Sequence, residues 1–283
     1  MTADPAVLTP DQRDAWLARI GAEAPAAPTR AALDALMAAQ QAHIPFENLD
    51  PLVGRPVRID LPSILDKLVA RRRGGYCFEQ NTLFAAGLRA LGYHVVPLAA
   101  RVRWKVPDDV PTGLTHMLLR VEIDHEAYIA DVGFGGANMP RALALSHPAD
   151  AASTHRLVPD AAAGSGAFHA LALELRVADS WRTLYRFDLT PQQTIDYVAR
   201  NWYVCTYPES AFVQTLKGAR MVDGTRYTLA NRDFTIRAAD GTVQQQVLTT
   251  TAQILDALAG PIGIALDDSL RQALAARLPA VLP

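Results

Sequence analysis

The segment Arg73-Gly74-Gly75-Tyr76-Cys77-Phe78-Glu79-Gln80-Asn81 carries the strongest structural and chemical signal in the sequence. Its two glycines allow a tight turn with backbone angles that other residues resist. A helix is predicted to begin near Cys77 and to end before Gly92, a residue type common just after helix C-termini. Cys77 is therefore expected at the first turn of a helix, where unpaired N–H groups and the helix dipole favour an ionised sulfur. The same N–H groups can face the oxyanion that forms when a sulfur attacks a carbonyl.

The two cysteines differ in what surrounds them. On position alone Cys77 could be a small buried core residue, the usual role of a free cysteine. Cys205 has no comparable setting and is interpreted as a core residue. Because these two cysteines lie far apart in the sequence, no disulfide framework is predicted. Free cysteines fit a reducing compartment, so a cytoplasmic protein is predicted.

His116 and Asp131 supply the base and the orienting acid that a nucleophilic cysteine needs. They are predicted on consecutive strands joined by a tight turn at Asp124-His125. A two-residue turn places their side chains directly opposite each other or one diagonal step apart, on one face of the hairpin. A three-residue loop would place them on opposite faces, so the prediction depends on the turn. His43 and His94 are less suitable as the base, because no carboxylate is comparably placed beside them.

A glycine-rich loop, Val132-Gly133-Phe134-Gly135-Gly136, follows Asp131. It does not match the dinucleotide-binding fingerprint, because Asn138 stands where the third glycine is required. Such a loop could still let an extended cofactor approach and offer backbone N–H groups to its phosphates. The alternative is a simple turn or bulge at a strand end.

Length and composition bound the possible functions. At 283 residues the chain has room for roughly two domains of ordinary size. Its formal net charge of −2 provides no positive field for nucleic acid or anionic membranes. No stretch approaches a membrane span of roughly 20 apolar residues, and Met1 to Trp16 lacks the pattern of a secretion signal. The seven histidines show no metal-ligand spacing, so no metal is predicted.

Apolar periodicity divides the chain into helices, then short strands, then a mixed tail, which suggests three units around one site. Helices are predicted over residues 11–20, 30–43 with Thr29 as N-cap, 62–72, 77–91, from after Pro191 to about 202, 251–259 and 267–277. Strands are predicted over residues 94–104, 115–123, 127–132, 168–177, 181–189, 227–229, 234–237 and 243–249, with a loop over 158–166.

Taken together, these residues resemble the arylamine N-acetyltransferase family, and the resemblance extends over nearly the whole chain. The spacing of Cys77, His116 and Asp131 along the chain is similar to the family's. The matching segments are residues 73–81, His43-Ile44-Pro45-Phe46-Glu47-Asn48-Leu49, Thr115-His116-Met117-Leu118-Leu119, Ala130-Asp131-Val132-Gly133-Phe134-Gly135 and residues 201–212.

The resemblance implies an α+β fold with three parts. Residues 1–92 would form an N-terminal helical bundle that carries the catalytic cysteine. Residues 93–190 would form a central antiparallel β-barrel that carries the catalytic histidine and aspartate. Residues 191–283 would form a C-terminal α/β lid.

The resemblance also implies a papain-like catalytic triad, with Cys77 as nucleophile, His116 as base and Asp131 as its orienter. Acetyl-CoA would be the co-substrate, and arylamines, arylhydrazines or hydrazides would be the acceptors. The reaction would follow a ping-pong course through an acetyl-cysteine thioester.

Other residues take supporting roles by the same resemblance. Arg73 and Glu47 are expected to pair and brace the active-site turn. Phe46 and Phe134 would line the acceptor pocket. The residues expected near bound coenzyme A are Thr115, Phe134 and Gly135.

The sequence leaves several alternatives open. The same triad could serve an amide synthase of this family that closes a polyketide macrocycle, or a papain- or transglutaminase-like cysteine hydrolase. A non-catalytic binding module with a structural cysteine is a third possibility. The groups that meet the phosphates of coenzyme A are unassigned; Lys67, Lys105 and Lys217 are the candidates.

Overall fold

The computed structural model describes the chain except for residues 1–5, 108, 148–152, 161–170 and 283. The helices are α1 (Pro10–Ile20), α2 (Arg30–His43), α3 (Leu49–Leu52), α4 (Leu61–Ile64), the π-helix η1 (Leu65–Ala70), α5 (Cys77–Ala90), α6 (Thr194–Thr206), α7 (Ala211–Gln214), α8 (Thr251–Ala259) and α9 (Asp268–Val281). The strands are β1 (Phe46–Glu47), β2 (His94–Val102), β3 (Leu114–Ile123), β4 (Glu126–Ala130), β5 (Leu143–Ala144), β6 (His155–Pro159), β7 (Leu171–Val177), β8 (Ser180–Phe187), β9 (Lys217–Val222), β10 (Thr225–Ala230), β11 (Asp233–Arg237) and β12 (Val243–Val247).

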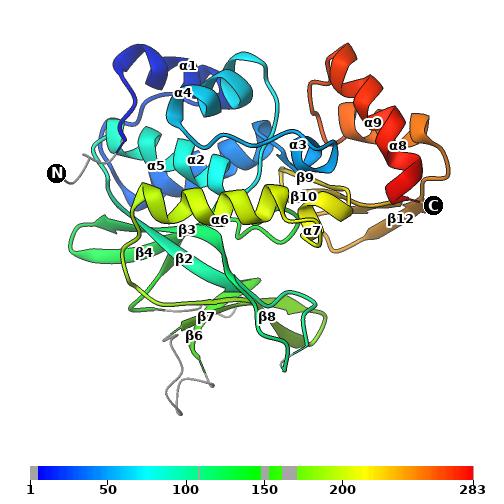
Figure 1. Cartoon of the computed structure of the whole chain (residues 1–283). Helices are drawn as coiled ribbons and strands as arrows, with labels where there is room; N and C mark the ends of the chain where they lie inside the picture. The colour runs from blue at the N-terminus through cyan, green and yellow to red at the C-terminus, as the bar shows by residue number, and fades with distance from the viewer. Residues whose placement is uncertain (1–5, 108, 148–152, 161–170, 283) are drawn as a thin grey trace.

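Seven antiparallel strands form the central sheet, a nearly closed barrel with the order β5-β4-β3-β2-β8-β7-β6. The N-terminal helices lie together on one side of this sheet, and α6 crosses between them and the barrel strands in the view of Figure 1. The predicted α+β class with a central antiparallel barrel is therefore confirmed.

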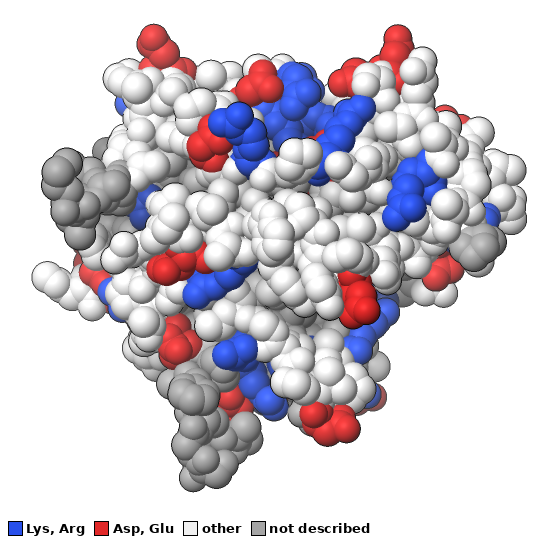
Figure 2. Space-filling model, in the orientation of Figure 1, with Lys and Arg blue, Asp and Glu red and all other residues white. Residues whose placement is uncertain are grey.

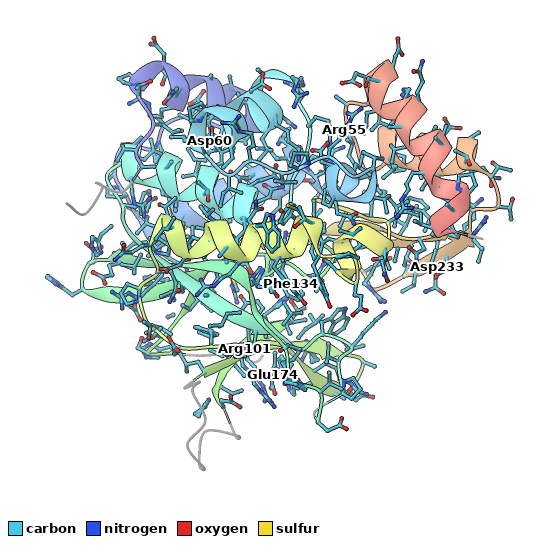
Figure 3. The ribbon with its side chains drawn as sticks, in the orientation of Figure 1. Arg55, Asp60, Arg101, Phe134, Glu174 and Asp233 are labelled. Carbon is cyan, nitrogen blue, oxygen red and sulfur yellow. The ribbon has the colours of Figure 1, made fainter. Side chains whose placement is uncertain are left out.

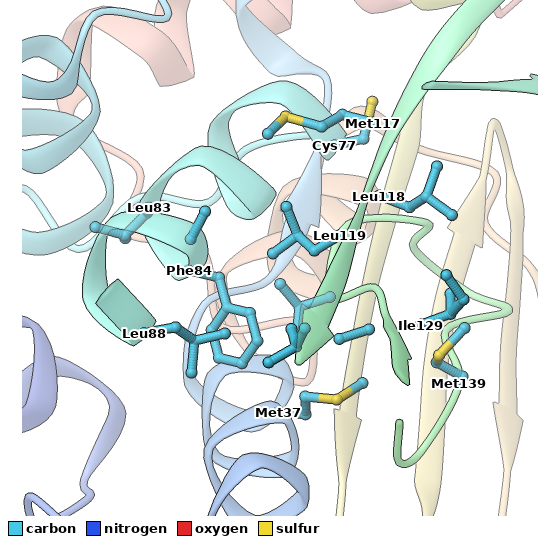
Figure 4. Packing of buried hydrophobic residues seen from close by; sticks show 14 of the residues in the cluster. Met37, Cys77, Leu83, Phe84, Leu88, Met117, Leu118, Leu119, Ile129 and Met139 are labelled. Atoms are coloured by element: carbon cyan, nitrogen blue, oxygen red, sulfur yellow. The ribbon is translucent and has the colours of Figure 1, made fainter. Parts of the chain in front are cut away.

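Helix α5 is the central element of the helical layer. Nearly its whole length is buried, because it packs between the other N-terminal helices and the barrel. Figure 4 shows Leu83, Phe84 and Leu88 of α5 on the side of Leu119 in β3, and all four side chains are inaccessible to solvent. This packing fixes the start of α5, and with it Cys77, against the strand that carries His116.

The C-terminal part has its own sheet, β1-β9-β10-β11-β12, covered by α8 and α9. A second apolar cluster joins Leu49 and Leu52 of α3 to Leu258 of α8 and Leu274 of α9. Strand β1, from the N-terminal third, pairs with β9. The division into units at residues 1–92, 93–190 and 191–283 stays a prediction.

Most predicted elements are found, and the exceptions have local causes. The helix predicted over residues 62–72 is a short α-helix continued by a π-helix that ends at Ala70. The loop predicted over 158–166 is wrong at its start, since Val158 and Pro159 pair with β7. Asp160 follows the strand without regular structure, as the loop prediction requires, whereas residues 161–166 of that loop and 168–170 of a predicted strand lie outside the described residues. Strands β1, β5, β6 and β9 were not predicted.

Charge is mixed on the visible surface. Figure 2 shows basic and acidic side chains interspersed, with a broad uncharged area at the level of α6. Exposed Ile195, Val198 and Trp202 belong to this helix. Among the described residues, no helix is long and apolar enough to cross a membrane.

Candidate active site

The hairpin of β3 and β4 brings His116 and Asp131 together. Its turn consists of Asp124 and His125, both with positive φ, as a tight two-residue hairpin turn requires. Leu119 pairs with Ala130, so Asp131 follows the end of β4 and lies one diagonal step from His116. The Nε2 atom of His116 is 2.6 Å from Oδ2 of Asp131. The predicted turn and the shared face are both confirmed.

Three further contacts hold the Asp131 carboxylate. Oδ1 accepts hydrogen bonds from Nδ2 of Asn81 at 2.9 Å and from the backbone N–H of Gly133 at 2.8 Å. The hydroxyl of Tyr185 donates to Oδ2 at 3.2 Å. Burial alone would raise the pKa of Asp131, but the charge of His116 and the hydrogen bonds hold it below its usual range. Asp131 is therefore an anion that fixes the imidazole through Nε2.

Cys77 is the first residue of α5 and is 4% exposed. Its sulfur lies 3.8 Å from the backbone oxygen of Thr115, the residue before His116. Burial opposes protonation of His116, but the charge of Asp131 and hydrogen bonds to Asp131 and Cys77 raise the pKa of His116 to about 10. Of the groups that favour the protonated ring, Asp131 contributes most and Cys77 less.

Asn81 joins the two halves of this group. It lies one helical turn after Cys77 on α5, and its amide donates to the backbone oxygen of Met117 at 2.8 Å as well as to Asp131. Its oxygen accepts from the N–H of Val132 at 3.1 Å. A single buried side chain thus links the cysteine helix, the histidine strand and the aspartate loop.

Gly133 explains why the loop can lie so close to the cysteine. A Cβ atom at this position would be 2.7 Å from Cα of Cys77 and 2.8 Å from Nδ2 of Asn81. Gly74 has a similar role before the helix, where a Cβ would be 2.2 Å from the backbone oxygen of Pro45. The prediction that Gly74 and Gly75 supply unusual backbone angles is wrong, because Arg72 has the positive φ in this turn. The glycines instead allow close approach.

A buried group of charges lies beneath the start of α5. Arg73 donates to Oε1 of Glu47 at 2.6 and 3.0 Å, so the predicted contact between them is present. Lys67 lies 2.7 Å from Asp50 and 2.8 Å from Glu79. Burial raises the pKa of Glu79 to about 7, with Lys67 acting in the opposite direction. Lys67 is therefore committed to carboxylates inside the protein, and its candidacy for a coenzyme A phosphate is wrong.

The backbone N–H groups of the glycine-rich loop donate hydrogen bonds to side chains in and beside the loop. Those of Phe134 and Gly135 both donate to Oδ1 of Asn138, at 2.7 and 3.0 Å, and that of Gly133 donates to Asp131. These three N–H groups are therefore already bonded within the protein, and an approach of coenzyme A to this loop stays a prediction. Asn138, which breaks the dinucleotide fingerprint, is the residue that organises the loop.

Aromatic side chains surround the cysteine and histidine. Phe134 lies edge-on to His116, with ring centroids 5.2 Å apart, and is labelled beneath α6 in Figure 3. Phe46 packs against Gly135, where a Cβ would be 3.0 Å from its ring. Phe212 of α7 lies 6.3 Å from the Phe46 ring centroid. Phe134 and Phe212 are only partly buried, so their rings form an apolar, accessible side of the site.

Two remaining sequence expectations concern ligands and alternative bases. Within the described part of the chain, no group of three His, Cys, Asp or Glu side chains could hold a metal ion. His94 does have a carboxylate partner, Glu122 at 2.9 Å, contrary to expectation. Its side chain is 66% exposed, so it lacks the enclosed setting of His116.

Sequence reasoning missed three residues that touch or shape the site. Asn81 was inside the quoted motif, and its helical spacing from Cys77 was the signal that could have identified it. Tyr185 and Asn138 gave no signal, because their roles depend on strand pairing and loop closure that the local pattern does not encode.

Comparison with known proteins adds the decisive observation. A family model described as N-acetyltransferase matches residues 29–271. The arylamine N-acetyltransferase of Mycolicibacterium smegmatis is 37% identical over 94% of this chain and 97% of its own length. The enzyme of the same name from Escherichia coli K12 is 36% identical over 90% of this chain and 89% of its own. This chain belongs to the arylamine N-acetyltransferase family.

The fold of the family is shared as well. The structure of the Mycobacterium marinum arylamine N-acetyltransferase superposes with a TM-score of 0.88 at 35% identity, over 96% of this chain and all of that one. A second structure of the M. marinum enzyme, in complex with CoA, gives a TM-score of 0.87 over 95% of this chain and 99% of that one. Membership of this acyltransferase family, suggested by the motifs around Cys77, is confirmed.

Proposed function

We propose that this protein transfers the acetyl group of acetyl-CoA to arylamines, arylhydrazines or hydrazides through an acetyl-Cys77 thioester. The observation that carries the proposal is the arrangement around His116. One nitrogen is held by Asp131 at 2.6 Å, and the ring also bonds to the cysteine at the start of α5. In this assignment Cys77 is the nucleophile, His116 the base and Asp131 its orienter.

The first half-reaction exchanges one thioester for another. Cys77 lies at the first turn of α5, and Cys77 is among the groups that raise the pKa of His116. In the proposed step the sulfur attacks as its thiolate. The thiolate attacks the acetyl carbonyl, and the backbone N–H groups at the start of α5 face the oxyanion. The carbon–sulfur bond to coenzyme A then breaks, and His116 gives its proton to the departing thiolate. Little free energy is lost, because one thioester replaces another.

The second half-reaction passes the acetyl group to nitrogen. Because His116 has given its proton to the departing coenzyme A, the ring is neutral and can act as a base. The amine attacks the acetyl carbon, His116 takes the amine proton, and Cys77 leaves as a thiolate. An arylamine suits this step because it is neutral near pH 7. Exclusion of water by the surrounding aromatic rings would limit hydrolysis of the thioester.

We assign the acceptor and coenzyme A to the accessible, aromatic side of the site. Phe46 and Phe134 would line the acceptor pocket, as their rings flank the loop that follows Asp131. Thr115, Phe134 and Gly135 would lie near bound coenzyme A. We also place the activity in the cytosol, where free cysteines stay reduced.

Intact-mass analysis with Cys77→Ala and Cys205→Ala as a matched pair tests the proposal. Both cysteines are buried, but only Cys77 contacts the histidine. Acetyl-CoA should add one acetyl group to wild type and to Cys205→Ala, and none to Cys77→Ala. An arylamine should then remove it as an acetylated product.

Three kinds of outcome would contradict the proposal. Loading at Cys205, or none in the wild type, would exclude the Cys77 thioester. Loss of the acetyl group to water, unaffected by any amine, would point to a cysteine hydrolase instead. If loading occurs but only long amino-acyl chains accept or donate, the amide synthase assignment would replace the arylamine one.

A further inference from the structure

The buried charges beneath the start of α5 do not balance. Three carboxylates and two cations lie together there, contributed by Glu47, Asp50, Glu79, Lys67 and Arg73. Each of these side chains is at most 12% exposed, so water compensates little of the one negative charge in excess. A net charge inside a protein is costly, and one bound proton removes it. The group is therefore expected to bind a proton at a pH where an exposed glutamate binds none.

The contacts of each carboxylate decide where that proton binds. Glu47 accepts two hydrogen bonds from Arg73, and Asp50 contacts Lys67 at 2.7 Å and Arg73 at 3.3 Å. Among the described residues Glu79 contacts one cation, the ammonium of Lys67 at 2.8 Å, which it shares with Asp50. Burial raises the pKa of Glu79 to about 7; Lys67 opposes this shift, and the two other carboxylates add to it. The proton therefore binds to Glu79.

The other ionisable groups around Glu79 keep their charge near neutral pH. Burial opposes protonation of Lys67 and Arg73, but the carboxylates raise the pKa of both above its ordinary value. Arg19 of α1 lies behind the group, and burial lowers its pKa only to about 10. Burial raises the pKa of Tyr76 well above its ordinary value, so its phenol stays neutral. A titration of this group near pH 7 therefore belongs to Glu79.

The carboxylate of Glu79 also holds the turn that presents Cys77. Its Oε2 atom accepts a hydrogen bond from the backbone N–H of Tyr76, the residue before Cys77, at 3.1 Å. A Cβ atom at Gly75 would lie 2.7 Å from the same oxygen, so the carboxylate packs directly on the backbone of this turn. Both partners of the carboxylate, this N–H and the ammonium of Lys67, are donors. An added proton would face a donor on either oxygen, so it weakens one of these contacts.

We propose that Glu79 is a positioning residue for Cys77, whose carboxylate holds the turn before α5 and releases it when it binds a proton. The inference rests on the proposed acetylation of Cys77. Acetyl-enzyme formation should therefore be fastest above about pH 7, where Glu79 is ionised. The effect on stability has the opposite sign, because the folded protein binds this proton more tightly than the unfolded chain. Stability from protonated Glu79 is present below pH 4.5 and is lost as the pH rises through about 7.

The test measures the rate of acetyl-enzyme formation in wild type and Glu79→Gln from about pH 5.5 to about pH 8.5. Glutamine has nearly the shape of the protonated acid and no charge, so the variant reproduces the low-pH state throughout. The ratio of the wild-type rate to the variant rate cancels the titration of the reacting groups, which both proteins share. This ratio should be about tenfold at the alkaline end, the effect of one charge-assisted hydrogen bond. It should fall to about one at the acid end, with a midpoint near pH 7.

Asp66→Asn is the matched control. Asp66 lies on η1 beside Lys67, but its side chain is 61% exposed and pairs with Arg71 at the surface. This variant should acetylate as fast as wild type at every pH. A wild-type to Glu79→Gln ratio that does not change with pH would overturn the proposal, because a merely structural role predicts a constant loss.

Two further measurements keep this inference separate from the proposed function. If acetyl-CoA does not load the wild type, the proposed function fails, and alkylation of Cys77 by iodoacetamide in a Cys205→Ala background supplies the rates instead. The same pH-dependent ratio should appear, and a constant ratio would overturn the positioning role. If Glu79→Gln does not fold, the wild type labelled with ¹³C in its glutamate carboxyl groups is titrated by NMR. One glutamate should titrate near pH 7, and its absence would overturn the proposal.

Discussion

Asn81 holds Asp131 in place but is not itself one of the three residues proposed to react. Removing its side chain should therefore show how much the rate depends on the position of Cys77, His116 and Asp131. Its amide group donates to Asp131 at 2.9 Å and to the Met117 oxygen at 2.8 Å, and it accepts from the Val132 N–H at 3.1 Å. Asn81→Ala would leave the Met117 oxygen and the Val132 N–H buried without these partners. Asp131 would keep its contacts with Gly133 and His116 but could rotate.

The structure sets the size of both expected effects. Each buried polar group left without a partner costs about 1–3 kcal/mol, so the free energy of unfolding should fall by about 2–6 kcal/mol. For a chain of this length that corresponds to a drop in Tm of roughly 3–10 °C. Because a displacement of about 1 Å at a reacting group costs about 100-fold in rate, acetyl transfer to Cys77 should slow by that order.

The assay is the rate of acetyl-enzyme formation from acetyl-CoA, measured by rapid quench and intact mass at a temperature where the variant is folded. Asn81→Ala should lower the maximal rate of acetyl-enzyme formation. It should change the acetyl-CoA concentration needed for half of that rate much less, because Asn81 is fully buried. Thr82→Ala is the matched control, because the adjacent Thr82 makes only a 3.7 Å contact with the Met117 sulfur. An Asn81→Ala protein that acetylates as fast as Thr82→Ala would refute this reasoning, even if its Tm were lower.

Three further predictions follow from other contacts. Gly133→Ala should slow acetyl-enzyme formation about 100-fold, because its methyl group would be 2.7 Å from Cα of Cys77; a normal rate would show that the loop can move away freely. His155 is buried, and burial lowers its pKa from 6.5 to about 4, although a hydrogen bond to Ala137 opposes this. Its neutral form therefore stabilises the fold above pH 6.5, and roughly 3 kcal/mol should be lost as pH falls toward 4. Denaturant unfolding across this pH range should show the loss in wild type and a shallower slope in His155→Gln; equal slopes would contradict the assignment. Lys67→Met should lower the unfolding free energy by about 3–5 kcal/mol, since Arg73 alone would face three carboxylates, and an unchanged denaturation midpoint would exclude this.

The hairpin that carries His116 and Asp131 could be predicted because its geometry is local. Alternation along two strands and a two-residue turn fix which side chains share a face, so His116 and Asp131 could be paired from spacing alone. The start of α5 was equally accessible, since glycines followed by a helical pattern mark a boundary. Thr29 was recognised as an N-cap for the same reason, and its side chain accepts from the N–H of Ala32.

The rest of the site depends on contacts between segments far apart in the sequence. Strand β1 has only two residues, and it exists because it pairs with β9, whose Lys217-Gly218 start has little strand character. Lys67 is a candidate for a coenzyme A phosphate by sequence, but in the structure it lies in the π-helix and contacts Asp50 and Glu79. Tyr185 reaches Asp131 only because β8 pairs with β2. No local pattern contains this information.

His116 is the residue on which the two halves of the proposed reaction impose opposite requirements. Thioester formation needs a protonated ring to stabilise the attacking sulfur, whereas attack by the amine needs a ring that can accept a proton. Asp131 favours the cation, which suits the first step. In the proposed reaction His116 then gives its proton to the departing coenzyme A, so the first half-reaction itself leaves a neutral ring that can act as the base. The proposed reaction requires Asp131 to remain an anion although it is buried. The hydrogen bonds from Asn81 and Gly133 help to keep its carboxyl group ionised.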